Sequence, residues 1–514
     1  MTDKVGKKPY LGIIIDYDRE NNLDKFSLDT LKDRYFWKEE THAQEALARA
    51  SVFGATFKGI TDFDLAQRLY EYSSNFWFMF STPILSNGGT SRGLPISCFL
   101  NYVPDSRQGL SDHYDENIWL ASHGGGIGGY WGDIRSNGIS TRHGSKSTGS
   151  IPFMHVVDSQ MLAFNQGVTR RGSYAAYMDI SHPEIEEFIN MRKESGGDIH
   201  RKCLNLHNGI NLTNEFLEAV KNDDEWRLID PKTKQAVKSV DARYLWWQII
   251  DARAETGEPY MINIDTCNEH LPDSLKDLGL EIRQSNLCSE ITLPTNEERT
   301  AVCCLSSVNL AEYDSWKDNK QFIDDLITML DNVLEHFIEY VVDTSQLGEY
   351  NANYRRFKSY LKKDKHGLHK AAFSAYRERS IGLGAMGFHA FLQSKGVSFE
   401  GLQATSYNYS IFKDIKKKAT KATKRLAEER GSYPDSNDGT SRHAHLLAIA
   451  PNASSSIICG GTSPSIEPMR ANIYTHKTLS GTYSVKNKYL DDIINKKFKT
   501  KKEIDDVNDK LSKL

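Results

Sequence analysis

The sequence predicts an α/β fold that contains a substantial parallel sheet. Apolar runs of strand length recur along the chain, and stretches with helical periodicity separate them, which is the order expected of β-α-β units. Apolar residues make up 39% and charged residues 26% of the 514 residues, a balance typical of globular domains. A chain of this length can form one large catalytic domain or two to three ordinary ones.

The N-terminal region is expected to be helical. Residues 1–25 are polar, and apolar residues then recur at helical spacing from Leu28 to about Phe80. A short strand-like run interrupted by a turn follows at 80–91. Strands are then expected at 95–103, 209–212, 260–264, 301–310 and 445–450, and helices at 111–123, 242–257, 321–345, 383–394 and 403–430.

Two segments each allow two interpretations, and a tryptophan pair has one default interpretation. The glycine-rich run 123–129 could cradle a phosphate, but a helix end turning into a strand is favoured because no complete phosphate-loop motif is present. The lysine-rich helix around 413–425 could bind nucleic acid, but its partial apolar stripe favours a solvated face. The adjacent Trp246 and Trp247 are expected to pack in the core.

Charge and cysteine usage exclude several classes of protein. The net charge of −4 gives no basic field for nucleic acid, no apolar run is long enough to span a membrane, and the first ten residues lack the features of a secretory signal. Seven scattered cysteines argue against a disulfide framework, and none has zinc spacing, so no metal site is predicted. We therefore expect a cytoplasmic protein, in the cytoplasm of a host if it is viral.

The stretch most suggestive of chemistry is 283–295. Cys288 stands two residues from the amide of Asn286 and two from the carboxylate of Glu290. Apolar Leu287, Ile291 and Leu293 predict that this segment is buried or half-buried. The combination indicates one-electron sulfur chemistry beside an acid/base group.

Several separated motifs, in order, resemble the catalytic subunit of ribonucleotide reductase. N-L-C-S-E at 286–290 resembles its finger loop, V-C-C-L-S-S-V-N-L at 302–310 its strand with the partner cysteine, and S-I-E-P-M-R at 465–470 its G-I-E-P-P-R run. The resemblance spans roughly 65–487. It implies a ten-stranded α/β barrel of the ribonucleotide reductase/glycyl-radical type, with the last strand or strands missing, and an N-terminal helical region. The implied domains are 1–78 (helical, no ATP cone), 79–485 (barrel, finger loop 283–295) and 486–514 (lysine-rich amphipathic tail).

The resemblance also implies roles. A thiyl radical on Cys288 would abstract the 3′-hydrogen of the ribose, Glu290 would act as general base, and Asn286 would hold the ribose. Cys98 would protonate the departing 2′-hydroxyl and then form a disulfide with Cys303, which requires neighbouring strands. Cys304 is assigned to the opposite strand face, and a register slip of one residue would exchange it with Cys303. Substrate contacts would come from Thr82, Ser97, Asn286, Glu290, Pro451, Asn452, Ala453, Ser454, Ser455 and Ser456.

Polar loops at 135–149 and 165–175 are interpreted either as ordinary surface loops or, by the resemblance, as the family's two allosteric loops. Asp105, Arg135 and Arg142 would then hold an effector nucleotide, a deoxynucleoside triphosphate or ATP, and Arg170 would face the substrate base. Helices near 111–123 would form a homodimer interface. By the resemblance, the ATP cone carries the site at which dATP switches the enzyme off. Because no cone is found in this sequence, we expect dATP not to switch the protein off at such a site.

The family's C-terminal features are not found after Arg470. The chain has no Tyr-Tyr relay and no cysteine after Cys459. The expectation is a phage-like, N-terminal piece of a split subunit, completed by a C-terminal fragment. No cofactor is expected to bind directly. A di-metal small (beta) subunit would supply the radical, and thioredoxin or glutaredoxin the thiol reductant.

Two alternatives remain open. A cobalamin-dependent class II reductase shares the finger loop and needs no relay tyrosines. A non-catalytic nucleotide-binding remnant is the second, although Cys98, Cys288, Glu290 and Cys303 are all present. Class I is favoured by the runs G-L-P-I-S-C and K-T-L-S-G-T-Y-S-V-K-N.

Overall fold

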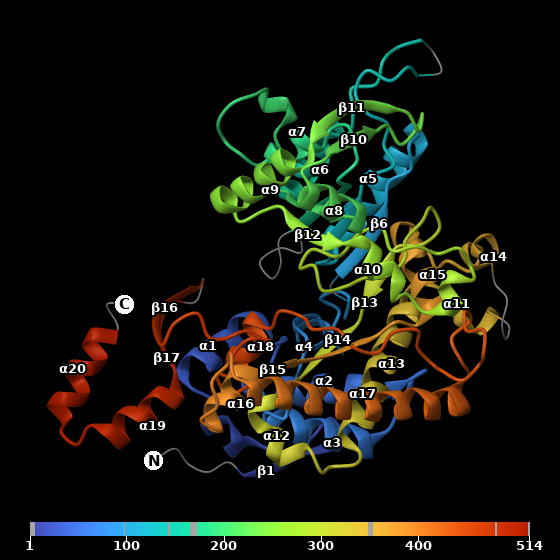
Figure 1. Cartoon of the computed structure of the whole chain (residues 1–514). Helices are drawn as coiled ribbons and strands as arrows, with labels where there is room; N and C mark the ends of the chain where they lie inside the picture. The colour runs from blue at the N-terminus through green and yellow to red at the C-terminus, as the bar shows by residue number, and fades with distance from the viewer. Residues whose placement is uncertain are drawn as a thin grey trace.

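A computed structural model describes residues 6–96, 98–141, 144–164, 172–347, 353–478 and 481–511 (Figure 1). The larger sheet has six strands in the spatial order β12-β9-β8-β7-β6-β13. All neighbours pair in parallel except β13, which is antiparallel to β6. The predicted α/β class with parallel sheet is therefore confirmed. The strands are β6 (Cys98–Tyr102), β7 (Gly126–Tyr130), β8 (Ser173–Asp179), β9 (His207–Leu212), β12 (Tyr260–Asn263) and β13 (Ala301–Cys303).

Helices connect the parallel strands of this sheet. The predicted helices at 111–123 and 242–257 are present, and the run 123–129 is the end of α5 turning into β7 through Gly124, whose φ of 82° suits glycine. The prediction for the tryptophans is half wrong, because Trp246 packs against the core whereas Trp247 is 62% exposed. The connecting elements are α5 (Arg107–Ser122), α6 (Ile151–Ala163), α7 (Ile185–Asn190), α8 (Asn214–Asn222), β10 (Glu225–Ile229), β11 (Ala236–Asp241), α9 (Ala242–Thr256), α10 (Ile264–Glu269) and α11 (Asp273–Lys276).

A second sheet continues from the first. Its order is β15-β14-β5, with β14 (Leu305–Asn309) parallel to β15 (Gly382–Met386) and antiparallel to β5 (Phe78–Phe80). Only Cys304 separates β13 from β14, so one stretch of chain belongs to both sheets and joins them. Four helices accompany this sheet: α13 (Phe322–Val341), α15 (His369–Glu378), α16 (Phe388–Ser394) and α17 (Leu402–Arg430).

Three predictions around this sheet are corrected. The helix expected at 383–394 begins only at Phe388, because β15 occupies 382–386; a Cβ on Gly384 would lie 2.4 Å from the carbonyl oxygen of Ala448, so glycine allows the chain to pass there. The strand expected at 445–450 is reduced to a single bridge between Leu447 and Leu383. The strand-like run at 80–91 is instead β5 followed by helix α4 (Thr82–Asn87).

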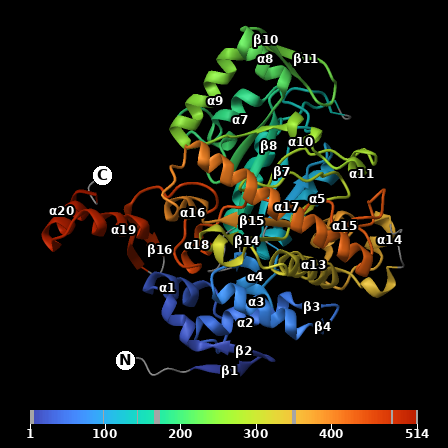
Figure 2. The same cartoon turned by 60° about the horizontal axis from the view of Figure 1, so that its bottom comes forward.

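The N-terminal region contains the predicted helices and one hairpin that was not predicted. The hairpin strands β1 (Lys7–Tyr10) and β2 (Ile13–Asp16) precede α1 (Lys25–Arg34), α2 (Ala43–Gly54), a short pair β3 (Thr56–Phe57) and β4 (Ile60–Thr61), and α3 (Phe63–Ser74). Helices α2 and α3, blue in Figures 1 and 2, lie close to α13. The hairpin was missed because its apolar alternation covers only Ile13 and Ile15, both buried.

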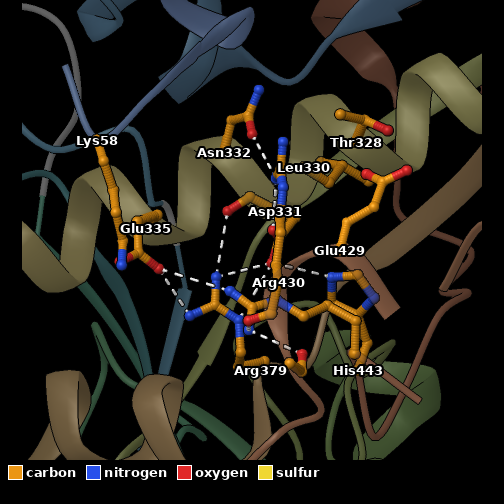
Figure 3. Close-up of polar contacts among 12 residues, drawn as sticks. Lys58, Thr328, Leu330, Asp331, Asn332, Glu335, Arg379, Glu429, Arg430 and His443 are labelled. Carbon is orange, nitrogen blue, oxygen red and sulfur yellow. Dashed lines mark hydrogen bonds and ion pairs between the residues drawn. The ribbon is translucent and has the colours of Figure 1, made fainter. Parts of the chain in front are cut away.

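A buried cluster of charges joins α13 to α17 and to the segments that flank β15. Asp331 and Glu335 of α13 face Arg379, Arg430, Arg442 and His443, and we call these six residues the Asp331 cluster (Figure 3). Asp331 is fully buried, and its carboxylate lies 2.7 Å from guanidinium nitrogens of both Arg379 and Arg430. The arginines hold the pKa of Asp331 well below its usual range, against the effect of burial.

The basic helix α17 packs through its apolar stripe, since Ile411, Ile415, Ala419 and Ala422 are buried. This confirms the solvated-face interpretation of its lysines.

The C-terminal region is a hairpin followed by two helices. The hairpin of β16 (Ile473–Thr478) and β17 (Gly481–Lys486) rests on α1, where Tyr483 stacks on Phe26 and donates a hydrogen bond to Asp29 (2.9 Å). Helices α19 (Lys488–Lys497) and α20 (Lys501–Leu511) extend to one side of the body in both views (Figures 1 and 2). Along α20, the apolar residues Ile504, Val507 and Leu511 are half-buried. Among the described residues, no helix is long and apolar enough to cross a membrane.

Candidate functional site

The stretch 283–295 forms a loop that the larger sheet holds at its root. An isolated bridge between Ile282 and Pro294 closes the loop. Gln284 donates to the carbonyl of Asn101 on β6 (2.9 Å), and Asn211 on β9 donates to the carbonyl of Arg283 (2.7 Å). Hydrogen bonds to two strands therefore fix where the loop begins, and we call residues 283–295 the finger loop.

Asn286 shapes the tip of the finger loop. Its Oδ1 accepts hydrogen bonds from the backbone N–H groups of Glu290 (3.0 Å) and Ile291 (3.1 Å), which folds the chain back on itself. Ser289 completes the turn with a φ of 63°, a left-handed conformation uncommon for residues other than glycine. The prediction that this segment is buried or half-buried is wrong for Cys288, which is exposed, because this turn places it at the tip, beyond the buried Asn286.

Two residues that sequence reasoning missed support the loop. A Cβ on Gly128 of β7 would lie 2.0 Å from the carbonyl oxygen of Ser285, so only glycine lets the loop cross this strand. Tyr177 of β8 is fully buried and donates its hydroxyl to the carbonyl of Asn286 (2.6 Å). A glycine inside a strand is a known sign of close backbone approach, so Gly128 could have been found; Tyr177 carried no such sign.

Cys98 and Cys303 lie directly opposite each other on β6 and β13. Facing residues of an antiparallel pair have Cα atoms about 4.5–5.5 Å apart, within the range that a disulfide bridges. Both side chains belong to one apolar cluster with Ile291 and Leu293 of the finger loop. Cys304 packs instead in the main core, on the other side of the strand, where burial raises the pKa of its thiol.

A cavity of about 50 Å³ lies between the finger loop and the junction of the two sheets. Glu290, Cys303, Ser380 and His445 are among its lining residues. Burial, and then the electrostatic effect of the nearby Cys98, raise the pKa of Glu290 to about 7. Glu290 Oε2 and Asn286 Nδ2 are buried, and neither has a hydrogen-bond partner among the described residues. Both groups can therefore take up a polar ligand.

The serine-rich segment 451–456 lies beside the N-terminal helices. It begins helix α18 (Ala453–Ile458), in which Ser455 and Ser456 are buried. Ser454 accepts a hydrogen bond from Arg34 of α1 (3.1 Å), and the neighbouring Tyr35 hydroxyl lies 3.1 Å from Oγ1 of Thr82 at the start of α4. The end of α1 thus joins the two segments that carry the predicted substrate residues, and Arg34 is a basic residue there that sequence reasoning missed.

Comparisons with known proteins match this chain almost end to end. The family model described as ribonucleotide reductase, barrel domain, matches residues 96–440 and 436–513, and the one described as its all-alpha domain matches 21–93. The chain belongs to the ribonucleotide reductase large-subunit family. The predicted barrel of the ribonucleotide reductase type is thereby confirmed. The barrel match also reaches over the C-terminal region, where the sequence shows no relay or redox motif of the family. The boundaries proposed at 78/79 and 485/486 stay predictions.

Named relatives are viral and cellular. A Frog virus 3 protein provisionally named as a ribonucleoside-diphosphate reductase large subunit is 47% identical over 83% of this chain and 70% of its own length. The large subunit of Invertebrate iridescent virus 3 is 42% identical over 93% of this chain and 79% of its own length. Among solved structures, the Actinobacillus ureae class Id ribonucleotide reductase alpha subunit matches with a TM-score of 0.78 and 30% identity, covering 96% of this chain and 82% of that one.

The structure describes two of the predicted effector residues, Asp105 and Arg135. Asp105 follows β6 and Arg135 follows β7, and the guanidinium of Arg135 lies 2.9 Å from the carboxylate of Asp105. This hydrogen-bonded partner raises the pKa of Arg135. Arg142, Arg170 and Ser97 lie outside the described residues. Within the described ranges, no group of three or more His, Cys, Asp or Glu could hold a metal ion.

Proposed function

We propose that this chain is the catalytic part of a ribonucleoside-diphosphate reductase, which reduces ribonucleotides to 2′-deoxyribonucleotides. The observation that carries the proposal is the facing pair Cys98 and Cys303, packed against the finger loop that bears Cys288 and Glu290. The names of the viral relatives support the same activity. A non-catalytic remnant would not need to retain this arrangement.

Each proposed step has a residue suited to it. A thiyl radical at Cys288 takes the 3′-hydrogen atom of the ribose, while the carboxylate of Glu290 takes the proton of the 3′-hydroxyl. Cys98 gives its proton to the 2′-hydroxyl, which leaves as water. Cys303 then gives its hydrogen to C2′ and the pair closes a disulfide, so the two thiols have supplied two electrons and two protons. Glu290 returns its proton to the 3′-oxygen, and Cys288 returns the hydrogen atom to C3′, which restores the thiyl radical. An external dithiol reopens the disulfide. Because the pKa of Glu290 is about 7, its carboxylate is the major form only above that pH.

The radical is proposed to come from a separate di-metal small subunit, as in class I enzymes. The class Id structural relative favours this source over cobalamin. A class II enzyme would instead work with adenosylcobalamin and no second subunit. Thioredoxin or glutaredoxin is the proposed reductant, and Asp105 and Arg135 would help to hold an effector nucleotide. We also propose action as a homodimer in the cytoplasm, that of a host if the gene is viral.

The sequence contains no Tyr-Tyr pair that could pass a radical to Cys288. We propose that a C-terminal segment, continuous with this chain in a longer protein or separate from it, supplies the relay tyrosines. The test is CDP reduction by the chain with the small subunit, with and without an added C-terminal polypeptide of a viral relative. Turnover that requires the polypeptide supports the proposal. Full turnover without it contradicts the need for such a segment, and no turnover in any combination, adenosylcobalamin included, contradicts the proposed activity.

We predict that Arg34, together with the serine-rich segment 451–456, helps to bind the substrate diphosphate. In the variant Arg34→Ala, KM for CDP should rise about tenfold while kcat changes less than threefold, because loss of a charge-assisted phosphate contact costs about 1.5 kcal/mol. Lys25, an exposed basic residue at the start of α1, is the control: Lys25→Ala should leave KM unchanged. An unchanged KM in Arg34→Ala would show that this arginine contacts no phosphate.

Glu290 is predicted to destabilise the folded protein at neutral and alkaline pH. Its folded-state pKa of about 7 lies above its ordinary value of 4.5, so the unfolded chain ionises first as the pH rises. Stability is therefore lost between these two pH values and stays lost above them. Urea unfolding of Glu290→Gln should show a gain of about 1–3 kcal/mol over wild type at pH 8 and no difference near pH 4.5. A difference that is the same at both pH values would contradict this.

A further inference from the structure

A chain of hydrogen-bonded groups ends at the cavity beside Cys303. Glu378, at the end of α15, accepts a hydrogen bond from the hydroxyl of Ser380 (3.0 Å). The same hydroxyl lies 2.9 Å from Nδ1 of His445. Glu378 and Ser380 are buried, and both Ser380 and His445 line the cavity with Glu290 and Cys303. None of the steps proposed above uses Glu378, Ser380 or His445.

The cavity links these groups to Cys303. Its volume of about 50 Å³ is larger than the roughly 10–15 Å³ that one water needs, so it has room for water. Because His445 and Cys303 line the same cavity, waters in it can carry a proton between the ring and the sulfur. Because Nδ1 is engaged by Ser380, Nε2 is the ring nitrogen that remains for this exchange.

The three groups can move a proton without ever forming an imidazolium. When Glu378 is protonated, it donates to Ser380, Ser380 donates to Nδ1, and Nε2 carries a proton toward the cavity. If Nε2 gives up that proton, Nδ1 takes the Ser380 proton, Ser380 takes the Glu378 proton, and the ring is neutral again. Burial lowers the pKa of His445 to about 4, so the ring is neutral near pH 7. Burial also raises the pKa of Glu378, against Arg299 and the hydrogen bonds from Ser374 and Ser380, which lower it. The charges that face Glu378, Arg299 and Asp435, pair with each other at 2.7 Å.

We propose that Glu378, Ser380 and His445 form a proton relay that protonates Cys303 when an external dithiol reduces the Cys98–Cys303 disulfide, an inference that rests on the proposed function. A thiolate of the dithiol attacks the sulfur of Cys98, the disulfide bond breaks, and the Cys303 thiolate leaves. Nε2 of His445 gives its proton to this thiolate, and the relay shifts behind it. The second thiol of the dithiol then releases Cys98 as the dithiol closes its own disulfide. The dithiol loses two protons to solvent, and Cys98 and Cys303 gain two. The proton that Cys303 gains comes in effect from Glu378. A proton from solvent then restores Glu378 by passing through His445 and Ser380 in the opposite direction.

The test uses the full chain, oxidised with diamide and reduced with dithiothreitol at pH 7. Peptide mapping first establishes that oxidation links Cys98 to Cys303, and thiol labelling then follows the rate of reduction. In His445→Ala the rate should fall about tenfold or more, the loss expected when general acid–base assistance is removed. Added imidazole, which fits the space that the ring vacates, should restore much of the rate in this variant and leave wild type unchanged. The control His270→Ala, at an exposed histidine, should behave as wild type.

The outcomes distinguish failure of the proposed function from failure of the relay alone. If oxidised wild type contains no Cys98–Cys303 linkage, the redox pair is wrong, and the proposed function and the relay both fail. If the linkage forms but His445→Ala is reduced at the wild-type rate, or imidazole does not restore a lost rate, the relay alone is wrong. Ser380→Ala keeps the ring and is the second variant should His445→Ala not fold: the relay requires a similar slowing, and a wild-type rate would overturn it.

Discussion

Replacement of Cys288 by serine is expected to abolish nucleotide reduction, with kcat at least about 10³-fold lower in the assembled enzyme, the scale of loss when the reacting group itself is removed. The physical reason is bond strength: an S–H bond is close in strength to an activated C–H bond, whereas the O–H bond of serine is much stronger and cannot carry the radical. The free energy of unfolding should not change. Cys288 is exposed at the tip of the finger loop, and exposed substitutions usually change stability by less than about 0.5 kcal/mol.

Cys267→Ser is the matched control for Cys288→Ser. Cys267 is half-buried in α10, near the finger loop in sequence, and the proposed mechanism assigns it no role. The measurement is CDP reduction by the chain, small subunit and C-terminal segment, together with urea unfolding of each variant. Residual turnover of Cys288→Ser within tenfold of wild type would show that another residue starts the reaction. Oxidation of Cys98 and Cys303 should remain possible in Cys288→Ser, since diamide needs no radical.

The second large effect is expected at Asp331, where Asp331→Ala should lower the free energy of unfolding by about 3–5 kcal/mol, the usual consequence of removing one partner of a buried ion pair. Its carboxylate contacts Arg379, Arg430, Arg442 and His443 from one fully buried position. Without it, the buried guanidinium groups of Arg379 and Arg442 and the half-buried one of Arg430 keep Glu335 as the one carboxylate of the cluster. Urea unfolding monitored by circular dichroism measures the loss.

Asp324→Asn is the control on the same helix. Asp324 pairs with Arg425 at 2.7 Å, but both side chains are about one-third exposed, so the variant should lose no more than about 1 kcal/mol. Equal losses in the two variants would show that burial does not decide the strength of these pairs. Because Arg379 directly precedes Ser380, and His443 lies two residues before His445, Asp331→Ala should also disturb the wall of the cavity.

The α/β class and most elements could be predicted from the sequence, because strand-length apolar runs and helical periodicity are local signals. The glycine-rich strand β15 shows where such signals fail: its glycines are set by the close passage of Ala448, a contact distant in sequence. The Asp331 cluster was missed for a related reason. Its members come from four separate segments, and nothing in the local sequence around Asp331 or Arg379 indicates that they meet.

Some residues of the candidate site could also be predicted from the sequence, and others could not. Cys98, Cys288, Glu290 and Cys303 could be named because their residue types and order resemble those of a known family, and the required neighbouring strands are present. The exposure of Cys288 could not be foreseen from its apolar neighbours, since Asn286 folds the tip through its own side chain. Arg34 and His445 stand far from the finger loop in sequence, so only the folded chain brings them to the site.

The most direct measurement is a single turnover of the prereduced chain with the small subunit, the C-terminal segment and CDP, in the absence of external reductant. The deoxynucleotide is quantified by chromatography, and each cysteine's oxidation state by differential labelling and peptide mapping. We expect one Cys98–Cys303 disulfide for each dCDP formed, with Cys203, Cys304 and Cys459 still reduced. Formation of dCDP with no disulfide at this pair, or with oxidation of other cysteines in its place, would contradict this expectation.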